Sequence, residues 1–375
     1  MTVKIGIGAQ LRYGPRPMTD LPSLRLALRA WYLLRKRRLP WRDDPSPYRV
    51  WVSEIMLQQT QVVTVIPYFE RFMLAFPTVA ALASAPESDV MTLWSGLGYY
   101  RRARMLHAAA KAIVADHDGA LPASLEGLTS LPGVGRYTAG AIASIAFGVR
   151  APVLDGNVAR VLARLTALRD PVDGGAGQKA LWALADALVP ADDPSTHNQA
   201  MMELGALVCT PRSPSCGECP WSSRCVARAE RCAEELPLKK PKAAPKAVHA
   251  VAGYLLEDLA SDALLLARRP ADGLLGGLWE LPAIELASAR AAKKPALAAA
   301  FRERLGLTVE VGSHVGSVAH QFTHRTLTLE IYRVHTLAGT PTPSWYTDAR
   351  FVSASTPDAV PLSTLTRKVI AAVHA

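Results

Sequence analysis

Cysteine is scarce in this sequence, and long hydrophobic runs are missing. Only 5 of the 375 residues are cysteine, an odd number that favours a reducing compartment over a framework of disulfides. No apolar run reaches the roughly 20 residues that a membrane-spanning helix needs. The first residues carry scattered basic side chains but lack the apolar stretch of a secretory signal. These features exclude a disulfide-rich secreted protein and predict a cytoplasmic location without a membrane partner.

Acidic side chains are also scarcer than basic ones. The chain has 32 Asp and Glu against 42 Lys and Arg, which gives a net charge of +10. This balance favours an anionic polymer as partner, although ribosome or membrane-surface binding would give the same balance. Half of the residues are hydrophobic, so a chain of this length can bury the cores of two or three domains.

Four of the five cysteines lie close together, at Cys209, Cys216, Cys219 and Cys225. Structural zinc usually takes two C-x2-C pairs, and only Cys216 and Cys219 form one here. Four-cysteine ligation of an iron–sulfur cluster tolerates uneven spacing. We therefore expect these four thiols to hold a cluster, with structural or unpaired thiols as the alternative. Cys232 is left over.

Hydrophobic periodicity divides the chain into two domains. Residues 20–232 are expected to be mostly helical, residues 233–247 (AEELPLKKPKAAPKA) to be a linker, and residues 248–375 to be an α+β domain. Residues 1–17 show no helical period, so we expect residues 1–19 to be an unstructured segment, or to contain a start codon placed before the true one at Met18. The expected helices are 21–34, 48–60, 78–84, 87–95, 101–115, 137–147, 156–168, 178–189, 196–208 and 295–305, and strands are expected in 248–258, 263–270, 317–337 and 349–353.

A glycine-rich turn lies between two of the expected helices, at residues 131–138 (LPGVGRYT). Gly133 and Gly135 allow backbone conformations and a close approach that a side chain would block. A helix starting near Arg136 would point its free N–H groups toward the turn, which suits a phosphate. The string that begins at Leu131 resembles the hairpin of helix-hairpin-helix DNA-binding proteins. Such a hairpin grips the DNA backbone and reads no sequence.

Two carboxylic acids have unusual surroundings. Glu54 has Val50 and Leu57 as helical neighbours, so it faces an apolar surface where burial would raise its pKa and make it a general acid. A helix-surface glutamate is the alternative. Asp155 directly precedes an apolar helical pattern, and a plain helix N-cap is the alternative to a catalytic role.

Five strings of residues, taken in order, resemble the MutY family of adenine DNA glycosylases, which belongs to the endonuclease III superfamily. They are residues 51–61 (WVSEIMLQQTQ), 94–100 (WSGLGYY), 131–135 (LPGVG), 154–158 (LDGNV) and the cysteine loop, and they span about residues 25–225. The resemblance implies a mostly α helix-hairpin-helix glycosylase domain with an iron–sulfur loop, followed by an α+β Nudix-like domain. It also implies one [4Fe-4S] cluster on the four cysteines.

The resemblance assigns roles to the candidate catalytic residues. Glu54 matches the general acid that protonates N7 of adenine, and Asp155 matches the carboxylate that stabilises the cationic sugar. Asn157 and Tyr137 are implied to assist. Bifunctional members of the superfamily carry a lysine at the position of Tyr137, and tyrosine cannot form a Schiff base, so we expect no efficient strand cleavage.

Further positions match residues that contact DNA bases in the family. The adenine pocket is implied to be lined by Trp41, Arg42, Leu57 and Gln199, and the opposite base to be contacted by Gln59, Leu97 and Tyr99. A place in the hydrophobic core is the alternative for Trp41, Leu57 and Leu97.

The second domain begins with residues 273–282 (GLLGGLWELP), which resemble the start of the Nudix-like domain of MutY proteins. Aligned on Gly306, the metal-holding positions of a Nudix hydrolase carry Ala299, Ala300, Glu303 and Arg304, so we expect a recognition module without hydrolase activity. Phe322, Thr323 and His324 match the family loop that senses 8-oxoguanine. Strand residues with one buried face are the alternative.

These features predict a monofunctional adenine glycosylase that acts, as a monomer, on double-stranded DNA containing A opposite 8-oxoguanine or A opposite G. A bifunctional glycosylase-lyase for oxidised pyrimidines is the first alternative, and Tyr137 and the second domain speak against it. A non-catalytic lesion-binding protein is the second alternative, and the presence of both Glu54 and Asp155 argues against it. A nucleotide hydrolase is disfavoured by the missing carboxylates.

Overall fold

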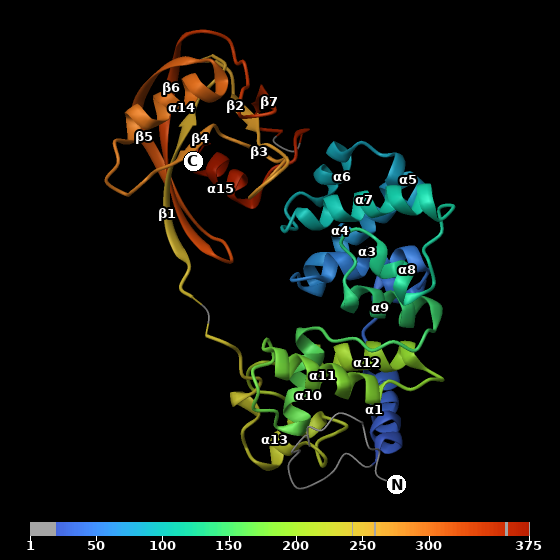
Figure 1. Ribbon diagram of the computed structural model, residues 1–375. Coiled ribbons are helices and arrows are strands. Elements are labelled where there is room, and N and C mark those ends of the chain that lie inside the picture. Colours follow the sequence, from blue (N-terminus) through green and yellow to red (C-terminus); the bar gives the residue numbers. More distant parts are fainter. Residues whose placement is uncertain (1–19, 242, 259, 357–358, 375) are drawn as a thin grey trace. The chain divides into compact units, whose positions relative to one another are not determined.

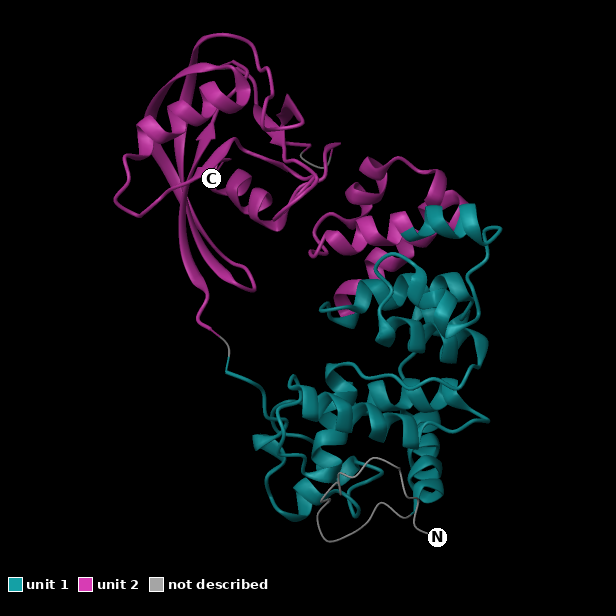
Figure 2. Cartoon of the chain, viewed as in Figure 1, with its two compact units in different colours: residues 1–62, 109–241 teal, residues 63–108, 242–375 magenta. Residues whose placement is uncertain are grey.

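The computed structural model describes residues 20–241, 243–258, 260–356 and 359–374 (Figure 1). The expected unstructured segment or early start at residues 1–19 lies outside this part. The chain forms two compact units, one built from residues up to 62 and 109–241, the other from 63–108 and 242–375 (Figure 2). The division after Pro241 falls inside the linker that was expected at residues 233–247.

The first unit is helical. Every helix expected here is present, and the structure adds the short helices α2, α8 and α13, whose few residues give no readable period. The helices are α1 (Leu21–Arg35), α2 (Pro40–Asp43), α3 (Pro47–Leu57), α8 (Leu125–Ser130), α9 (Arg136–Phe147), α10 (Gly156–Thr166), α11 (Gly175–Leu188), α12 (Pro194–Leu207) and α13 (Val226–Ala229).

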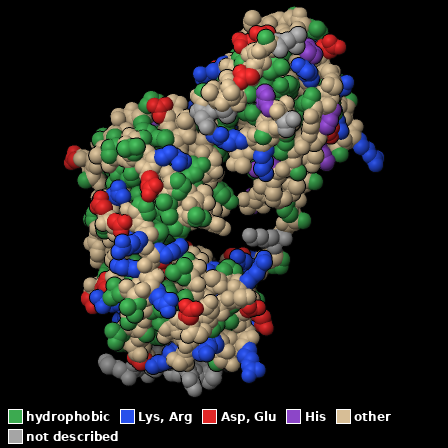
Figure 3. All heavy atoms as spheres, turned by 180° about the vertical axis from the view of Figure 1, so that it is seen from behind, with side chains coloured by type: hydrophobic (Ala, Val, Ile, Leu, Met, Phe, Trp, Pro, Cys, Tyr) green, Lys and Arg blue, Asp and Glu red, His purple; other side chains and the backbone are tan. Residues whose placement is uncertain are grey.

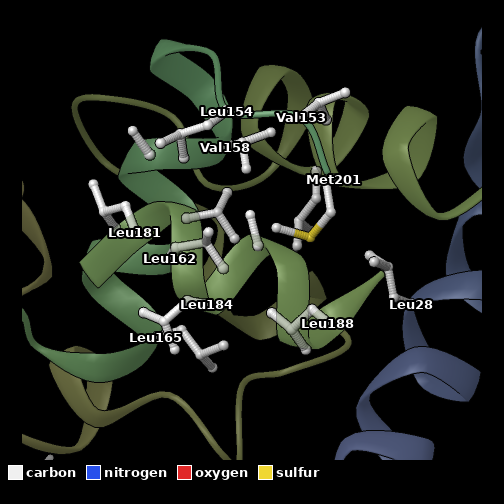
Figure 4. Close-up of a cluster of buried hydrophobic side chains, with 14 of the residues drawn as sticks. Leu28, Val153, Leu154, Val158, Leu162, Leu165, Leu181, Leu184, Leu188 and Met201 are labelled. Atoms are coloured by element: carbon white, nitrogen blue, oxygen red, sulfur yellow. The ribbon is translucent and has the colours of Figure 1, made fainter. Parts of the chain in front are cut away.

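A hydrophobic core joins α1, α10, α11 and α12 (Figure 4). Leu28, Leu162, Leu181 and Leu188 in this cluster have no exposed surface. Of the 11 residues of α10, nine are buried, so this helix is packed on nearly all sides. The core therefore fixes α10 and, with it, Asp155 at its N-terminus.

The second unit begins with four helices, α4 (Val62–Ala75), α5 (Val79–Ser84), α6 (Glu87–Trp94) and α7 (Arg101–Asp116), the last of which runs on into the first unit. The sequence analysis did not predict α4, which contains Pro67 in its interior. Proline inside a helix removes one backbone hydrogen bond, and the apolar face with Val65, Phe69 and Phe72 is buried all the same.

The rest of the second unit carries two sheets, in the order β4-β1-β6-β5 and β3-β2-β7. The central pair, β1 and β6, is parallel, with Ala252 opposite Ile331, and β5 pairs with β6 in antiparallel fashion. The strands are β1 (Lys246–Tyr254), β2 (Ala263–Arg268), β3 (Trp279–Glu280), β4 (Ala283–Glu285), β5 (Thr308–Gln321), β6 (Arg325–Ala338) and β7 (Asp348–Ser353).

Two helices, α14 (Lys293–Leu305) and α15 (Thr364–His374), cover opposite faces of the larger sheet. Alternate residues of β1 point to the two faces, so Val251 packs in one cluster with Phe301 of α14, and Ala252 in another with Val369 of α15. The α+β prediction is confirmed, although α15, β3, β4 and the first half of β5 were not foreseen.

Hydrogen bonds within the second unit join the turn after α6 to the segment before α15. The carbonyl oxygen of Leu362 accepts from Ser95 Oγ at 2.8 Å and from the Tyr100 hydroxyl at 2.9 Å. Arg367 Nη2 donates to Ser95 Oγ at 3.0 Å. None of the helices in the described ranges is both long and apolar enough to cross a membrane.

Candidate active site

Glu54 is buried inside the first unit, on a helix where eight of 11 residues are buried. Glu54 is only 5% exposed, so it is not a glutamate on the helix surface. Burial raises the pKa of Glu54, and so does the nearby Asp155, while a hydrogen bond from Tyr137 and the charge of Arg42 oppose the rise; the resulting pKa is about 7. A substantial share of this carboxyl is therefore protonated at neutral pH.

Tyr137 lies in the first turn of α9 and directs the Glu54 side chain. Its hydroxyl donates to Glu54 Oε2 at 2.7 Å and lies 3.2 Å from Met202 Sδ. Burial raises the pKa of Tyr137 well above its usual value, and the charges of Glu54 and Asp155 add to the rise. The phenol consequently stays protonated and donates to the carboxyl.

Asp155 is the N-cap of α10, as the capping alternative predicted. Its Oδ1 accepts from the backbone N–H of Val158 at 2.7 Å, and its Oδ2 accepts from Asn157 Nδ2 at 3.0 Å. Burial raises the pKa of Asp155, and these hydrogen bonds offset only part of the rise. Capping and catalysis do not exclude each other here, because the cap holds the carboxylate in one orientation close enough to raise the pKa of Glu54.

Asn157 is itself held in one orientation. Arg160 Nη2 donates to Asn157 Oδ1 at 2.9 Å and to the carbonyl of Gly205 at 2.8 Å, so the amide nitrogen of Asn157 faces Asp155. Gly205 of α12 permits this packing, since a Cβ built there would lie 2.6 Å from Asn157 Cβ. Arg160 Nε also donates to the carbonyl of Cys209 at 2.7 Å, which connects this site to the cysteine loop.

Two arginines bind a buried glutamate near this site. Glu203 of α12 is 1% exposed and accepts from Arg37 Nη2 at 2.8 Å and from Arg42 Nη2 at 3.0 Å. Burial by itself would raise the pKa of Glu203, but the hydrogen bonds from Arg37 and Arg42 outweigh it and lower the pKa to about 2. Gln199, one helical turn before Glu203, accepts from the Tyr32 hydroxyl at 3.2 Å. Arg42 and Gln199 thus have fixed positions.

The other residues predicted to contact bases differ in exposure. Trp41 and Leu97 are buried, at 6% and 5% exposed, as the core alternative expects, and Leu57 is half-buried. Gln59 and Tyr99 are exposed and have left-handed backbones, with φ of 58° and 49°. A left-handed backbone at a residue other than glycine is uncommon and holds the side chain out from the adjoining helix.

The expected hairpin lies between α8 and α9. Leu131 and Val134 are buried, whereas Gly133, with φ of +76°, and Gly135 are exposed. Gly135 is the N-cap of α9 and provides no side-chain acceptor, and a Cβ built there would meet nothing within 4 Å. The first N–H groups of α9 therefore face an open surface that suits a phosphate.

The four clustered cysteines line one cavity, together with Arg164 and Arg228. In the described part of the chain, no three His, Cys, Asp or Glu side chains lie close enough together to hold a single ion. The four sulfur atoms are thus spread around the cavity wall. Arg164 Nη1 points toward Cys209 Sγ at 3.4 Å, which fits a group that carries negative charge on its thiolates.

Further contacts anchor the cysteine loop to the helices. Arg164 of α10 donates to the carbonyls of Thr210 and Pro211 at 2.6 and 3.0 Å. Trp221 is 1% exposed, and its indole N–H donates to the carbonyl of Leu24 in α1 at 2.9 Å. Cys232 is buried but does not line the cavity.

In the second unit, Phe322, Thr323 and His324 form the turn between β5 and β6 and are not interior strand residues. Phe322 is half-buried, and its ring lies 4.6 Å from the ring of His320, while Thr323 and His324 are exposed. At the Nudix metal positions, Ala300 is buried and Arg304 donates to the carbonyl of Ala283 at 2.8 Å.

Three family models match the chain in succession. Residues 52–184 match the HhH-GPD superfamily of base excision DNA repair proteins. Residues 209–225 match the iron–sulfur binding domain of endonuclease III, and residues 253–372 match the NUDIX domain. The helical site, the cysteine loop and the sheet domain therefore each have a counterpart among known families.

Whole-chain relatives decide between the families that share these parts. The human adenine DNA glycosylase is 38% identical over 94% of this chain and 74% of its own length. The chain belongs to the adenine DNA glycosylase family. The Arabidopsis thaliana member is 39% identical over 86% of this chain and 59% of its own length. A thermostable thymine-DNA glycosylase structure is 28% identical, with a TM-score of 0.51, and covers 56% of this chain and 97% of its own.

An adenine DNA glycosylase hydrolyses the N-glycosyl bond that joins adenine to DNA, in base excision repair. Membership confirms the predicted enzyme class, the double-stranded DNA partner and the presence of an iron–sulfur region. The sequence analysis missed Arg37, Met202 and Glu203, which hold the site residues in place. No local pattern could have indicated that Glu203 pairs with Arg37, because the two residues are 166 positions apart in the sequence.

Proposed function

We propose that this adenine DNA glycosylase removes adenine opposite 8-oxoguanine, and opposite G, without cleaving the DNA strand. The observation that carries the proposal is the pair of carboxyls at the centre of the first unit. Glu54 is buried, has a pKa of about 7 and is directed by Tyr137, while Asp155 is held by Val158 N–H and Asn157. Two neighbouring carboxyls with different environments are suited to acid and charge-stabilising roles.

In the proposed reaction, a flipped adenine enters beside Glu54, which donates its proton to N7 and makes adenine a neutral leaving group. Positive charge then develops on the sugar, and the carboxylate of Asp155 stabilises it. Asn157 and Tyr137 act by orienting the two carboxyls, because each donates a hydrogen bond to one of them. Water completes the hydrolysis.

The absence of a nucleophilic amine at the hairpin supports a monofunctional reaction. Tyr137 occupies the position where bifunctional relatives carry lysine, and its hydroxyl is committed to Glu54 at 2.7 Å. A phenol cannot form the Schiff base that precedes strand cleavage. We therefore expect an abasic product whose strand stays intact until alkali is added.

Cys209, Cys216, Cys219 and Cys225 are proposed to hold one [4Fe-4S] cluster. Four thiols spread around one cavity suit a multi-atom cluster, and such thiols stay reduced in the proposed cytoplasmic location. When bound, the cluster supplies iron–thiolate bonds that join the loop into one rigid unit. Arg164 and Trp221 then hold this unit against α10 and α1.

Recognition of the opposite base is proposed for the turn that contains Phe322, Thr323 and His324, in a Nudix-like domain of residues 248–375. Exposed polar groups beside a half-buried ring can stack on a base and bond to its edge. Exposed Gln59 and Tyr99 are proposed to contact the opposite base together with Leu97. Trp41, Arg42, Leu57 and Gln199 are proposed to line the adenine pocket.

One assay tests the proposal. The protein, expected to be a monomer in size-exclusion chromatography, is incubated with duplexes containing A opposite 8-oxoguanine, A opposite G, or thymine glycol, with and without alkali. Alkali-dependent cleavage of the adenine strand in the first two duplexes is the expected result. Cleavage without alkali, or at thymine glycol, would assign a lyase activity instead, and binding without adenine release would assign a lesion-binding protein.

A further inference from the structure

A cationic groove lies beside the hairpin in the first unit. An open groove is lined by Arg136 at the start of α9 and by residues of the outer face of α11. The α11 residues are Gln178, Lys179, Trp182, Ala183 and Asp186. None of these residues belongs to the adenine pocket, the cysteine loop or the hairpin glycines.

Arg136 is held at the edge of this groove by an aromatic ring. Its guanidinium carbon lies 3.8 Å from the ring centroid of Trp182. Trp182 is half-buried and packs against the core cluster of α10 and α11, so the ring is a fixed platform. A cation over an indole face is attracted by the ring, so this contact holds the guanidinium at the groove.

The groove has an uncompensated positive charge. Asp186 is its acidic residue, and Arg150 Nη1 already pairs with Asp186 Oδ1 at 2.9 Å. Within the described residues, neither Arg136 nor Lys179 takes part in an ion pair. Both are exposed, and both would lower their energy by approaching an anion.

We propose that this groove binds a backbone phosphate of DNA next to the phosphate held by the hairpin. The proposal rests on the proposed function, since it takes DNA as the occupant. Arg136 directly follows Gly135, the N-cap of α9, so the groove borders the hairpin. Arg136 and Lys179 supply the charge, Gln178 an additional donor, and none of them reads sequence.

Salt dependence of binding tests the groove without using adenine release. Arg136→Gln, Lys179→Gln and the double variant are compared with wild type for binding to an undamaged duplex at several salt concentrations. Each lost phosphate contact should reduce the slope of log K against log salt by about 0.9. The double variant removes the one proposed phosphate contact, so it should lose about 0.9 of slope, and equally on a duplex with A opposite 8-oxoguanine.

Two further variants separate charge from packing. Lys111→Gln removes an exposed cation from α7, outside the groove, and should leave the slope unchanged. Ala183→Glu puts an acid into the groove without touching the hairpin and should weaken binding at low salt at least tenfold. Circular dichroism and thermal melting of each variant monitor the fold, and Lys179→Gln is informative even if Arg136→Gln destabilises the protein.

An unchanged slope in a folded Lys179→Gln variant, with Ala183→Glu binding like wild type, would overturn the proposal and leave the groove to an acidic protein partner. Failure of this proposal and failure of the proposed function would give different results. If the wild-type protein does not release adenine but the variants still show a reduced slope, the proposed function is refuted and the phosphate-binding groove is supported.

Discussion

Glu54 and Asp155 are chemically similar side chains with different surroundings. Glu54 has one hydrogen-bond donor, Tyr137, and little exposed surface, so desolvation dominates and the proton is retained. Burial also raises the pKa of Asp155, but Asp155 accepts from a backbone N–H and from an amide, and these two hydrogen bonds offset part of the rise. The site thus holds an acid and a carboxylate side by side at the same pH.

Glu54→Gln should bind the mispair and lose adenine release by about 10²–10⁴-fold, because the amide has no acidic proton. The variant should also be more stable than wild type at pH 8. The pKa of about 7 in the fold exceeds the value of about 4.3 in an unfolded chain, so wild type loses stability as pH rises through this window. Single-turnover kinetics measure adenine release, and thermal melting at pH 5 and pH 8 measures stability. Glu70→Gln, at an exposed position, is the control.

The pH profile should follow the Glu54 carboxyl. Adenine release should fall about tenfold per pH unit above pH 7, where the acid is deprotonated. Tyr137→Phe removes a hydrogen bond that lowers this pKa, so its profile should keep full slope but shift to higher pH. A profile that does not move in Tyr137→Phe would contradict the assigned contact between Tyr137 and Glu54.

Asp155→Asn should abolish turnover while the fold survives. An amide still caps α10 but cannot balance positive charge on the sugar. Asp193 caps α12 through the Thr196 N–H in the same way, so Asp193→Asn is the matched control and should retain activity. If both variants lose the same stability and keep adenine release, Asp155 is a cap and nothing more.

Local patterns explain how much of this site was predictable. The apolar helical neighbours Val50 and Leu57 indicated the burial of Glu54, and position before a helix indicated the cap at Asp155. The partners Glu203 and Arg37 gave no such signal, because they are 166 residues apart and meet only through the packing of α12. The roles of residues that act through tertiary contacts could therefore be found only from the structure.

At the scale of elements, α10 joins three parts of the first unit. Its N-terminus carries Asp155, its middle residue Arg160 bonds the Cys209 carbonyl, and Arg164 bonds the loop beyond it. Helices with a clear period, such as α10, were predicted within three residues, whereas α4 was missed and the short α2 and α8 offered too few residues to count. Tertiary packing decides such elements.

Cys219→Ser should lower the iron content and the yield of folded protein. Four thiols line the cavity, so the loss of one leaves an incomplete ligand set. Cys232→Ser is the control, since Cys232 is a buried cysteine outside the cavity and its substitution should leave iron unchanged. Iron analysis and visible absorption of the two purified variants measure the difference. Equal iron in both would mean that the ligand set is wrongly assigned.

At the scale of the whole molecule, histidine is unevenly distributed. Six of the nine histidines follow residue 242, and histidine side chains are visible on the sheet-bearing part in Figure 3. His324 and Phe322 stand at a turn between two long strands, a position that the sequence could not separate from a strand interior. Only the register of β5 and β6 shows where the chain reverses.

The double variant Phe322→Ala with His324→Ala should keep adenine release from A opposite G and weaken the preference for A opposite 8-oxoguanine. Specificity is a difference of affinities, so lost lesion contacts reduce discrimination and leave the chemistry intact. Discrimination is measured as the ratio between the two duplexes of the single-turnover rates and of the dissociation constants. His335→Ala with Leu337→Ala, exposed on β6, is the matched control. Equal ratios in the two double variants would assign discrimination to Gln59, Leu97 and Tyr99.

The burial of α10 has a consequence for how the chain tolerates random mutation. Nine of its 11 residues are buried, and two of them, Arg160 and Arg164, donate mostly to main-chain oxygens, which a substitution at the accepting residue does not remove. Neither a polar nor an apolar replacement can reproduce those forked donors. In a library of single substitutions selected for repair in cells, α10 should therefore be the least permissive helix, and lysine should fail at Arg160 and Arg164 as alanine does.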